Sequence, residues 1–233
     1  MWRKFFASHI EPEAAFLGSF VSFSEAHHFA RRHTDRVGYN KAHVDWQCAQ
    51  SFHAGSLPAL TSRLEAVARP GMRIALLGGQ RLRADVANCR LASANLNKIS
   101  WIELPEQNPS PPSVNVQFGG VVTCDVLLAD GALPYWNQAL QAELVDHDAR
   151  PAHLVLDSLS LTEASAFVTL HKVAGRVAPY LVDNDQHFVE QLCGLGYRLN
   201  KRWRNNDIDI GIPLANRCAE LALGMHLKYS GAG

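Results

Sequence analysis

The residues best suited to binding a nucleotide-like ligand are two glycines and an acidic residue at the ends of two apolar runs. Gly78 and Gly79 follow the run 72–77 (MRIALL), and Glu103 lies in the run 99–104 (ISWIEL). Glycine has no Cβ, so its backbone can approach a ligand closely. A carboxylate at a strand end can accept hydrogen bonds from both ribose hydroxyls. This pattern suggests an adenosine-containing cofactor, although a plain tight turn and a solvated Glu103 would leave the same pattern.

Three other residues are candidates for acid–base chemistry. His171 is the first candidate for a general base, because imidazole titrates near neutral pH. Tyr135, after the fourth predicted strand, and Asp157, at the end of the fifth, are alternatives. Each of the three could instead only pack or cap. The histidines near residue 30 lack acidic or cysteine partners at ligand spacing, so we expect no metal site there.

Strand and helix patterns alternate along most of the chain. Apolar runs predict strands at 72–77, 99–104, 113–118, 125–129 and 153–157, and a closing pair at 197–203 and 221–229. Helical patterns cover 56–69, 82–96, 135–145 and 186–195. We therefore expect a Rossmann-like α/β fold of about seven strands, with a mostly parallel sheet and helices on both faces. Ligands of such sheets bind at the carboxyl ends of the strands.

The first 55 residues are expected to form a helical lead-in or cap, and residues 56–233 the Rossmann-like domain. Within the lead-in, segment 22–32 has helical spacing, because Phe23, Ala26, Phe29 and Ala30 share one face.

Composition excludes several classes of partner. The 233 residues hold 22 lysines and arginines against 22 aspartates and glutamates, so the charge balance does not favour nucleic acid. No run approaches the roughly 20 apolar residues of a membrane-spanning helix. The five cysteines are scattered without a CxxC pair, as reduced thiols are, and no signal peptide is recognised. We expect a cytoplasmic protein that acts on a small molecule.

A series of separated segments carries a family resemblance. They are FVSFSEA at 20–26, Gly38-Tyr39, LGG at 77–79, WIE at 101–103, LPY at Leu133–Tyr135, LVLDSLSL at 154–161, FVTLH at 167–171, APY at 178–180, and Gly196-Tyr197 followed by Trp203. In this order the chain resembles a class I S-adenosylmethionine-dependent methyltransferase family that is often encoded beside bacterial surface-polysaccharide genes.

The resemblance implies a class I fold that binds S-adenosylmethionine and transfers its methyl group to a small or sugar-like acceptor. Gly78 and Gly79 would lie near the amino acid moiety of the cofactor, and Glu103, followed by Leu104, at the ribose. Asp130 would complete the cofactor-binding set and, with Leu133–Tyr135, border the acceptor.

Two further hypotheses remain open. Leu76 stands where the family has an aspartate and Leu82 where it has a third glycine. The chain could therefore be a non-catalytic methyltransferase-like protein with a degenerate cofactor site, acting as a binding or partner subunit. Under either hypothesis the protein could form a homodimer or bind a partner protein. A nicotinamide-dependent oxidoreductase ranks last, because the sequence lacks a GxGxxG motif and a YxxxK pair.

Overall fold

The computed structural model describes residues 14–33, 57–69, 72–77, 99–102, 124–131, 133–135, 140, 144–145, 150–173, 176–204, 209–212 and 217–231. The helix predicted at 82–96 and the strand predicted at 113–118 lie outside these residues. Of the helix predicted at 135–145, only Leu140, Leu144 and Val145 are described as helical.

Four parallel strands form the first half of the central sheet. They are β2 (Ile74–Leu77), β3 (Ile99–Ile102), β4 (Val126–Asp130) and β5 (His153–Thr162), in the spatial order β3-β2-β4-β5. The first three are runs of four or five mostly apolar residues, as is typical of strands buried on both faces, whereas β5 has ten residues and carries Asp157, Ser158 and Ser160. Leu77 of β2 pairs with Ile102 of β3 and with Ala129 of β4. The carboxyl ends of these three strands therefore meet at one edge of the sheet.

The second half of the sheet is antiparallel. β10 (Arg217–Tyr229) pairs antiparallel with β5, with β8 (Tyr197–Arg204) and with β9 (Asp209–Ile212). The expected closing pair of strands is confirmed. The expectation of a mostly parallel sheet is wrong: among the described strands, four pairings are parallel and five antiparallel. The described strands also number ten rather than about seven, because a second sheet, described below, joins the first.

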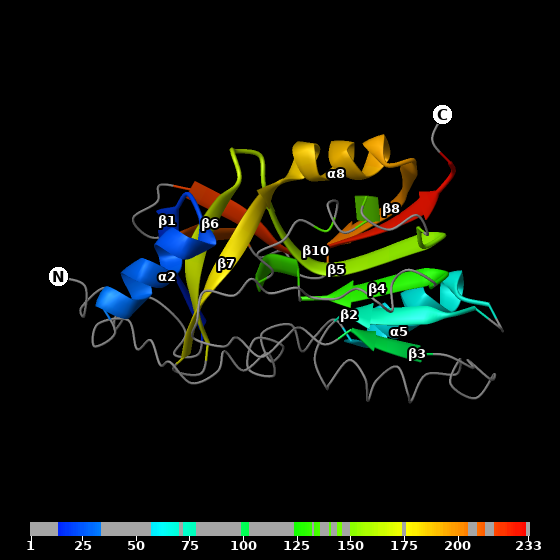
Figure 1. Ribbon diagram of the computed structural model, residues 1–233, viewed down its shortest axis with the longest axis horizontal. Helices are drawn as coiled ribbons and strands as arrows, with labels where there is room; N and C mark the ends of the chain where they lie inside the picture. Colours follow the sequence, from blue (N-terminus) through cyan, green and yellow to red (C-terminus); the bar gives the residue numbers. More distant parts are fainter. Residues whose placement is uncertain are drawn as a thin grey trace.

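Helices cover both faces of the central sheet, as the alternation of side chains along β4 shows. Val126 and Leu128 belong to the cluster that contains Leu64 of α5 (Leu57–Val67). Leu127 and Ala129 belong to the cluster that contains Phe188 and Leu192 of α8 (Asp185–Gly194). Figure 1 shows α8 along one side of the sheet and α5 beside β2. The predicted two-sided α/β arrangement is present.

A smaller antiparallel sheet stands at one end of the molecule (Figure 1). It consists of β1 (Ala14–Phe20), β6 (Phe167–Val173) and β7 (Arg176–Asn184), and β7 joins the end of β5. The predicted helix forms as α2 (Phe23–Arg32), which packs Ala26 and Ala30 on this sheet. The lead-in is not wholly helical, because segment 14–20 pairs with β6 as a strand. The domain division after residue 55 stays a prediction.

In the part of the chain that the structure describes, no helix is long and apolar enough to span a membrane.

Candidate functional site

Two buried carboxylates lie side by side where β4 ends. Asp130 pairs in register with Asp157 of β5, and their side chains are almost fully buried. Asp130 continues the side of β4 that carries Val126 and Leu128, so it points toward the α5 face. Two carboxylates withdrawn from water need hydrogen-bond donors or positive charge to offset their desolvation.

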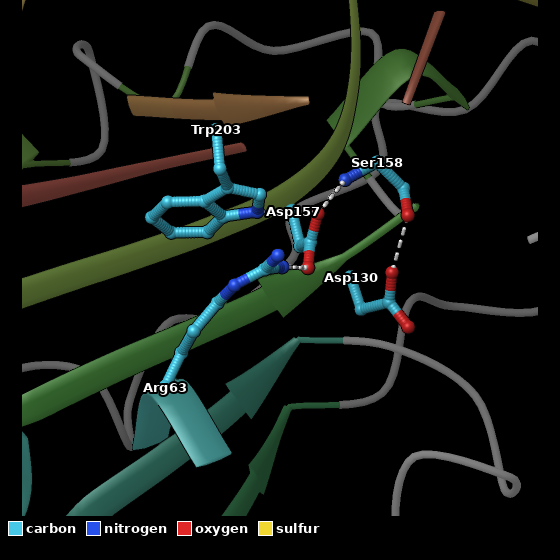
Figure 2. A network of polar contacts seen from close by, with 5 residues as sticks. All are labelled: Arg63, Asp130, Asp157, Ser158 and Trp203. Atoms are coloured by element: carbon cyan, nitrogen blue, oxygen red, sulfur yellow. Dashed lines mark hydrogen bonds and ion pairs between the residues drawn. The ribbon is translucent and has the colours of Figure 1, made fainter. Parts of the chain in front are cut away.

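Ser158 links the two carboxylates, as Figure 2 shows. Its backbone N–H donates to Asp157 Oδ1 at 2.8 Å, and its hydroxyl donates to Asp130 Oδ1 at 2.6 Å. Ser158 has a φ of 56°, in the left-handed region that residues with a Cβ seldom adopt. The register of β5 against β10 shifts at this point. This local irregularity allows the Ser158 hydroxyl to bond to Asp130 while Asp157 pairs with Asp130 in register.

Arg63 and Trp203 supply further donors to Asp157 (Figure 2). Arg63 Nη1, from α5, lies 2.7 Å from Asp157 Oδ2, and Trp203 Nε1, from β8, lies 3.3 Å from Oδ1. The guanidinium also stacks over the indole at 4.2 Å. Burial lowers the pKa of Arg63, and the charge and hydrogen bond of Asp157 oppose that change. Three donors therefore reach the two oxygens of Asp157, and donors of this kind favour the ionised form of a carboxyl group.

Gly224 of β10 makes room for the Trp203 indole. A Cβ at residue 224 would lie 2.0 Å from Trp203 Nε1, far inside van der Waals contact. The missing side chain therefore allows the indole to lie against β10 and reach Asp157.

A second buried pair joins η3 (Leu133–Tyr135) to the smaller sheet. The Tyr135 hydroxyl lies 2.6 Å from His171 Nδ1. Burial, and to a lesser extent Tyr180, raises the pKa of Tyr135 well above its usual range. The phenol therefore stays protonated, and the tautomer of His171 determines which of the two groups donates in this hydrogen bond.

Aromatic rings fix this pair in place. Phe16 of β1 stacks on His171 with ring centroids 4.3 Å apart, and Tyr180 of β7 meets the edges of Tyr135 and His171. The Tyr180 hydroxyl bonds to Ser160 Oγ at 2.5 Å. Ser160 lies three residues beyond Asp157, so β5 carries part of the carboxylate network and, through Tyr180, also contacts the surroundings of the tyrosine–histidine pair.

Within the described residues, no group of three or more histidine, cysteine, aspartate or glutamate side chains is placed to hold a metal ion.

Comparisons with known proteins show which fold this architecture belongs to. No family model matches the chain, and no curated protein matches it. Among solved structures, the 1,6-didemethyltoxoflavin-N1-methyltransferase of Burkholderia thailandensis, which holds 1,6-didemethyltoxoflavin and S-adenosylhomocysteine, has a TM-score of 0.54 at 15% identity. The match covers 96% of this chain and 98% of that one. The fold is that of the Rossmann-like methyltransferases.

Two less similar structures come from the same class. A protein of Listeria monocytogenes assigned as an S-adenosylmethionine-dependent methyltransferase matches at 11% identity and a TM-score of 0.46, over 75% of this chain and 100% of that one. The CcbJ methyltransferase of Streptomyces caelestis matches at 10% identity and 0.40, over 76% and 90%.

The structure brings four of the predicted site residues together as two pairs, and the other four are not described. Asp130 and Asp157 meet directly in register, and Tyr135 and His171 are hydrogen bonded to each other. The predicted cofactor residues Gly78, Gly79, Glu103 and Leu104 lie outside the described residues.

Sequence reasoning missed Arg63 and Ser158. Arg63 is one basic residue in an amphipathic helix, 94 positions from its partner Asp157. Nothing in the sequence marks Ser158 as left-handed, because glycine is the usual residue there. No local signal could have identified either residue.

Proposed function

We propose that this chain transfers a methyl group from S-adenosylmethionine to a small-molecule acceptor at the carboxyl edge of β2, β3, β4 and β5. The observation that carries the proposal is the register of these strand ends. Leu77, Ile102 and Ala129 pair side by side, and they precede Gly78, Glu103 and Asp130 in the chain. Sheets of this class bind ligands at that edge.

The charge at this edge suits a cationic cofactor. Asp130 and Asp157 are two carboxylates, and Arg63 is the cation that pairs with Asp157 in the described part of the chain. With both acids ionised, the three groups carry one excess negative charge, which attracts a sulfonium and an ammonium. When bound, S-adenosylmethionine supplies an electrophilic methyl group. The Burkholderia enzyme that shares the fold holds the demethylated product of this cofactor.

Tyr135 and His171 are assigned to the acceptor side. The neutral Tyr135 hydroxyl can accept the proton that an acceptor O–H or N–H loses while its own proton passes to His171 Nδ1. The acceptor atom would gain the methyl group as the carbon–sulfur bond of the cofactor breaks and S-adenosylhomocysteine leaves, and the proton that the acceptor loses would end on the imidazole through Tyr135. Phe16 and Tyr180 keep the imidazole in the orientation this relay needs.

Asp157 is assigned an anchoring role instead of that of a base. Its carboxylate already accepts from Arg63, Trp203 and the Ser158 backbone. Such donors stabilise the ionised form and make the group a poor proton acceptor.

Calorimetric titration with S-adenosylmethionine and S-adenosylhomocysteine tests the proposal. We expect micromolar binding by the wild type, a loss of at least about tenfold in Glu103→Ala, since a charged hydrogen-bond acceptor contributes about 1.5–3 kcal/mol, and no change in Glu190→Ala. Glu190 is exposed on α8 and bonds to Gln186 within that helix. The proposal would be rejected if neither ligand produced heat or thermal protection. That result would favour the non-catalytic methyltransferase-like protein, the hypothesis that Leu76 and Leu82 support.

A further inference from the structure

Two histidines are hydrogen bonded to each other at the amino end of β5, away from the carboxylate network. His153 is the first residue of β5, and its Nδ1 lies 3.0 Å from Nε2 of His226 in β10. Asp157 follows His153 by four residues in the same strand, a distance of roughly 13 Å at the rise of a β-strand. The histidine pair therefore lies toward the opposite end of the strands from the edge at which we place methyl transfer, and that reaction does not use it.

The hydrogen bonds of the pair leave one ring nitrogen available to a ligand. His226 uses both nitrogens, because its Nδ1 also lies 3.0 Å from Nδ2 of Asn200 in β8. His153 uses Nδ1, and the described residues offer no partner to its Nε2. When the His153 ring takes up a proton, Nε2 carries a hydrogen whichever tautomer the neutral ring had. A protonated His153 can therefore donate a hydrogen bond from Nε2 to an anion.

Cations surround the two rings. Lys228 is the register partner of His153 and lies two residues from His226, on the same face of β10. Lys201 of β8 is the register partner of His226. Burial is the main cause that lowers the pKa of both histidines; the charge of Lys228 lowers both further, Arg69 adds to the effect on His153, and His153 to that on His226. The pair is thus held neutral inside a positive field.

The one acid that contacts this cluster in the described part of the chain is already paired. The backbone oxygen of Asp125 accepts the His153 N–H at 3.0 Å, but the Asp125 carboxylate bonds to the Arg73 N–H at 2.7 Å and lies 3.4 Å from its guanidinium. Arg198 of β8 adds a further cation opposite Lys228. The whole chain has no net charge, so this local excess of positive charge is a property of the cluster.

Two ring nitrogens at 3.0 Å could also share a metal ion, but the surroundings do not favour one. The charges of Lys228 and Arg69 would repel a third cation. Within the described residues, no third histidine, cysteine or acidic side chain is placed to complete a metal site. The same charges attract an anion, and exposed lysine and arginine side chains can turn their N–H groups toward it.

We propose that His153, His226, Lys228 and Arg69 bind a dianionic tetrahedral oxyanion of the phosphate class, either free or as the phosphoryl group of a larger molecule. The ammonium and guanidinium groups supply charge-assisted hydrogen bonds. The negative charge of the ligand favours the protonated rings, so anion binding and proton binding strengthen each other. This site goes beyond the proposed function and does not depend on it.

Calorimetric titration of the full chain with sulfate, without S-adenosylmethionine, tests the site. Sulfate remains a dianion between about pH 5.5 and about pH 7.5, so the ligand itself does not titrate. Sodium chloride keeps the ionic strength constant, because salt screens exposed charges. We expect saturable millimolar binding that is tighter by about fivefold or more at the lower pH. NMR signals of the His153 ring, identified by their loss in His153→Gln, should show that sulfate raises its pKa.

Variants locate the site. Lys228→Gln and Arg69→Gln should each weaken sulfate binding about tenfold, the size expected for a hydrogen bond between charged groups. Both side chains are exposed, so their replacement leaves the core unchanged. The matched control is Arg32→Gln, because Arg32 is exposed on α2, at the other end of the molecule from α5, and should not affect binding (Figure 1). His226→Gln should keep binding at the higher pH but lose much of its pH dependence.

Inorganic phosphate and ethyl phosphate distinguish the two sources of the ligand. Equal affinity for both would support a site that binds the oxyanion alone. Tighter binding of ethyl phosphate would support a site for a phosphorylated molecule.

Three results would overturn the proposal. They are the absence of saturable sulfate binding at both pH values, binding that survives both Lys228→Gln and Arg69→Gln, and a shift of the two ring signals by Zn²⁺ but not by sulfate. None of them bears on cofactor binding, which is measured separately. Conversely, a chain that binds sulfate at this cluster but never binds S-adenosylmethionine would retain this site and lose the proposed function.

Discussion

Ser158 donates its hydroxyl hydrogen to Asp130 Oδ1 at 2.6 Å from a backbone with a φ of 56°. The left-handed backbone costs a residue with a Cβ roughly 1–2 kcal/mol. The hydrogen bonds to Asp157 and Asp130 offset that cost and hold both acids at the sheet edge.

The two effects can be separated by substitution. Ser158→Ala loses the hydroxyl but keeps the unfavourable φ, and we expect a loss of about 1–3 kcal/mol in the free energy of unfolding. Ser158→Gly loses the same hydroxyl but relieves the backbone, so it should be more stable than Ser158→Ala by about 1 kcal/mol. Urea denaturation of both variants checks the order. Equal stabilities would show that the backbone at Ser158 is not strained.

The buried ion pair between Arg63 and Asp157 should be costly to break from one side. Arg63→Met leaves the fully buried carboxylate of Asp157 without its counter-charge from α5. We expect the substitution to lower the free energy of unfolding by about 3–5 kcal/mol. Arg73→Met provides the matched control, because its pair with Asp125 is solvent exposed and should be worth less than about 1 kcal/mol. Thermal and urea unfolding measure both. A loss in Arg63→Met no larger than in the control would contradict the buried pair.

Gly224 should not tolerate a methyl group. Gly224→Ala places a Cβ 2.0 Å from Trp203 Nε1, so the indole must leave Asp157 and Arg63, at a cost of about 2–4 kcal/mol. Gly194→Ala on α8 meets no atom within 4 Å and should stabilise the helix by up to about 1 kcal/mol. Denaturation, together with the chemical shift of the Trp203 indole N–H, distinguishes the two. An unchanged indole signal in Gly224→Ala would place the ring elsewhere.

The pair His153 and His226 should make stability fall in mild acid. Burial is the main cause that lowers the pKa of both histidines from 6.5. The charges of Lys228 and Arg69 lower the pKa of His153 further, and His153 and Lys228 lower that of His226. The rings share a hydrogen bond at 3.0 Å, and His226 also contacts Asn200. The unfolded chain binds protons at these histidines at a higher pH than the folded chain does. The free energy of unfolding therefore decreases as the pH falls below about 6.5.

His226→Gln removes one member of that pair. Its free energy of unfolding should depend less on pH between about pH 8 and about pH 5 than that of the wild type, by up to one proton. Urea titrations across this range provide the comparison. A steeper dependence in the variant would mean that the folded pair binds protons more tightly than the unfolded chain does.

The sequence predicted the strands β2, β3 and β4, and the first half of β5 at 153–157, because each of these is a short hydrophobic run between turn signals. It did not predict β7, where Pro179 argues against a strand, and in the structure that proline lies in the ladder opposite Leu170. It also missed β1, because its conformation depends on pairing with β6, a strand far away in the sequence, as in the pair Ala14 and Val173.

For the site, sequence patterns identified single residues but not their partners. Tyr135 and His171 were separate candidates for one role, and the hydrogen bond that joins them depends on how η3 packs against β7 and β5, next to β6. Asp157 resembled a base by position alone. Its donors Arg63 and Trp203 lie 94 and 46 positions away from it in the chain, on either side, and only the folded structure brings them to it.

A crystal structure of the complex with S-adenosylhomocysteine tests the central claim most directly. We expect the ligand at the carboxyl ends of β2, β3 and β4, with the ribose hydroxyls at Glu103 and the methionine moiety facing Asp130. Crystals grown at saturating ligand that show it bound elsewhere, or not bound at all, would contradict the account.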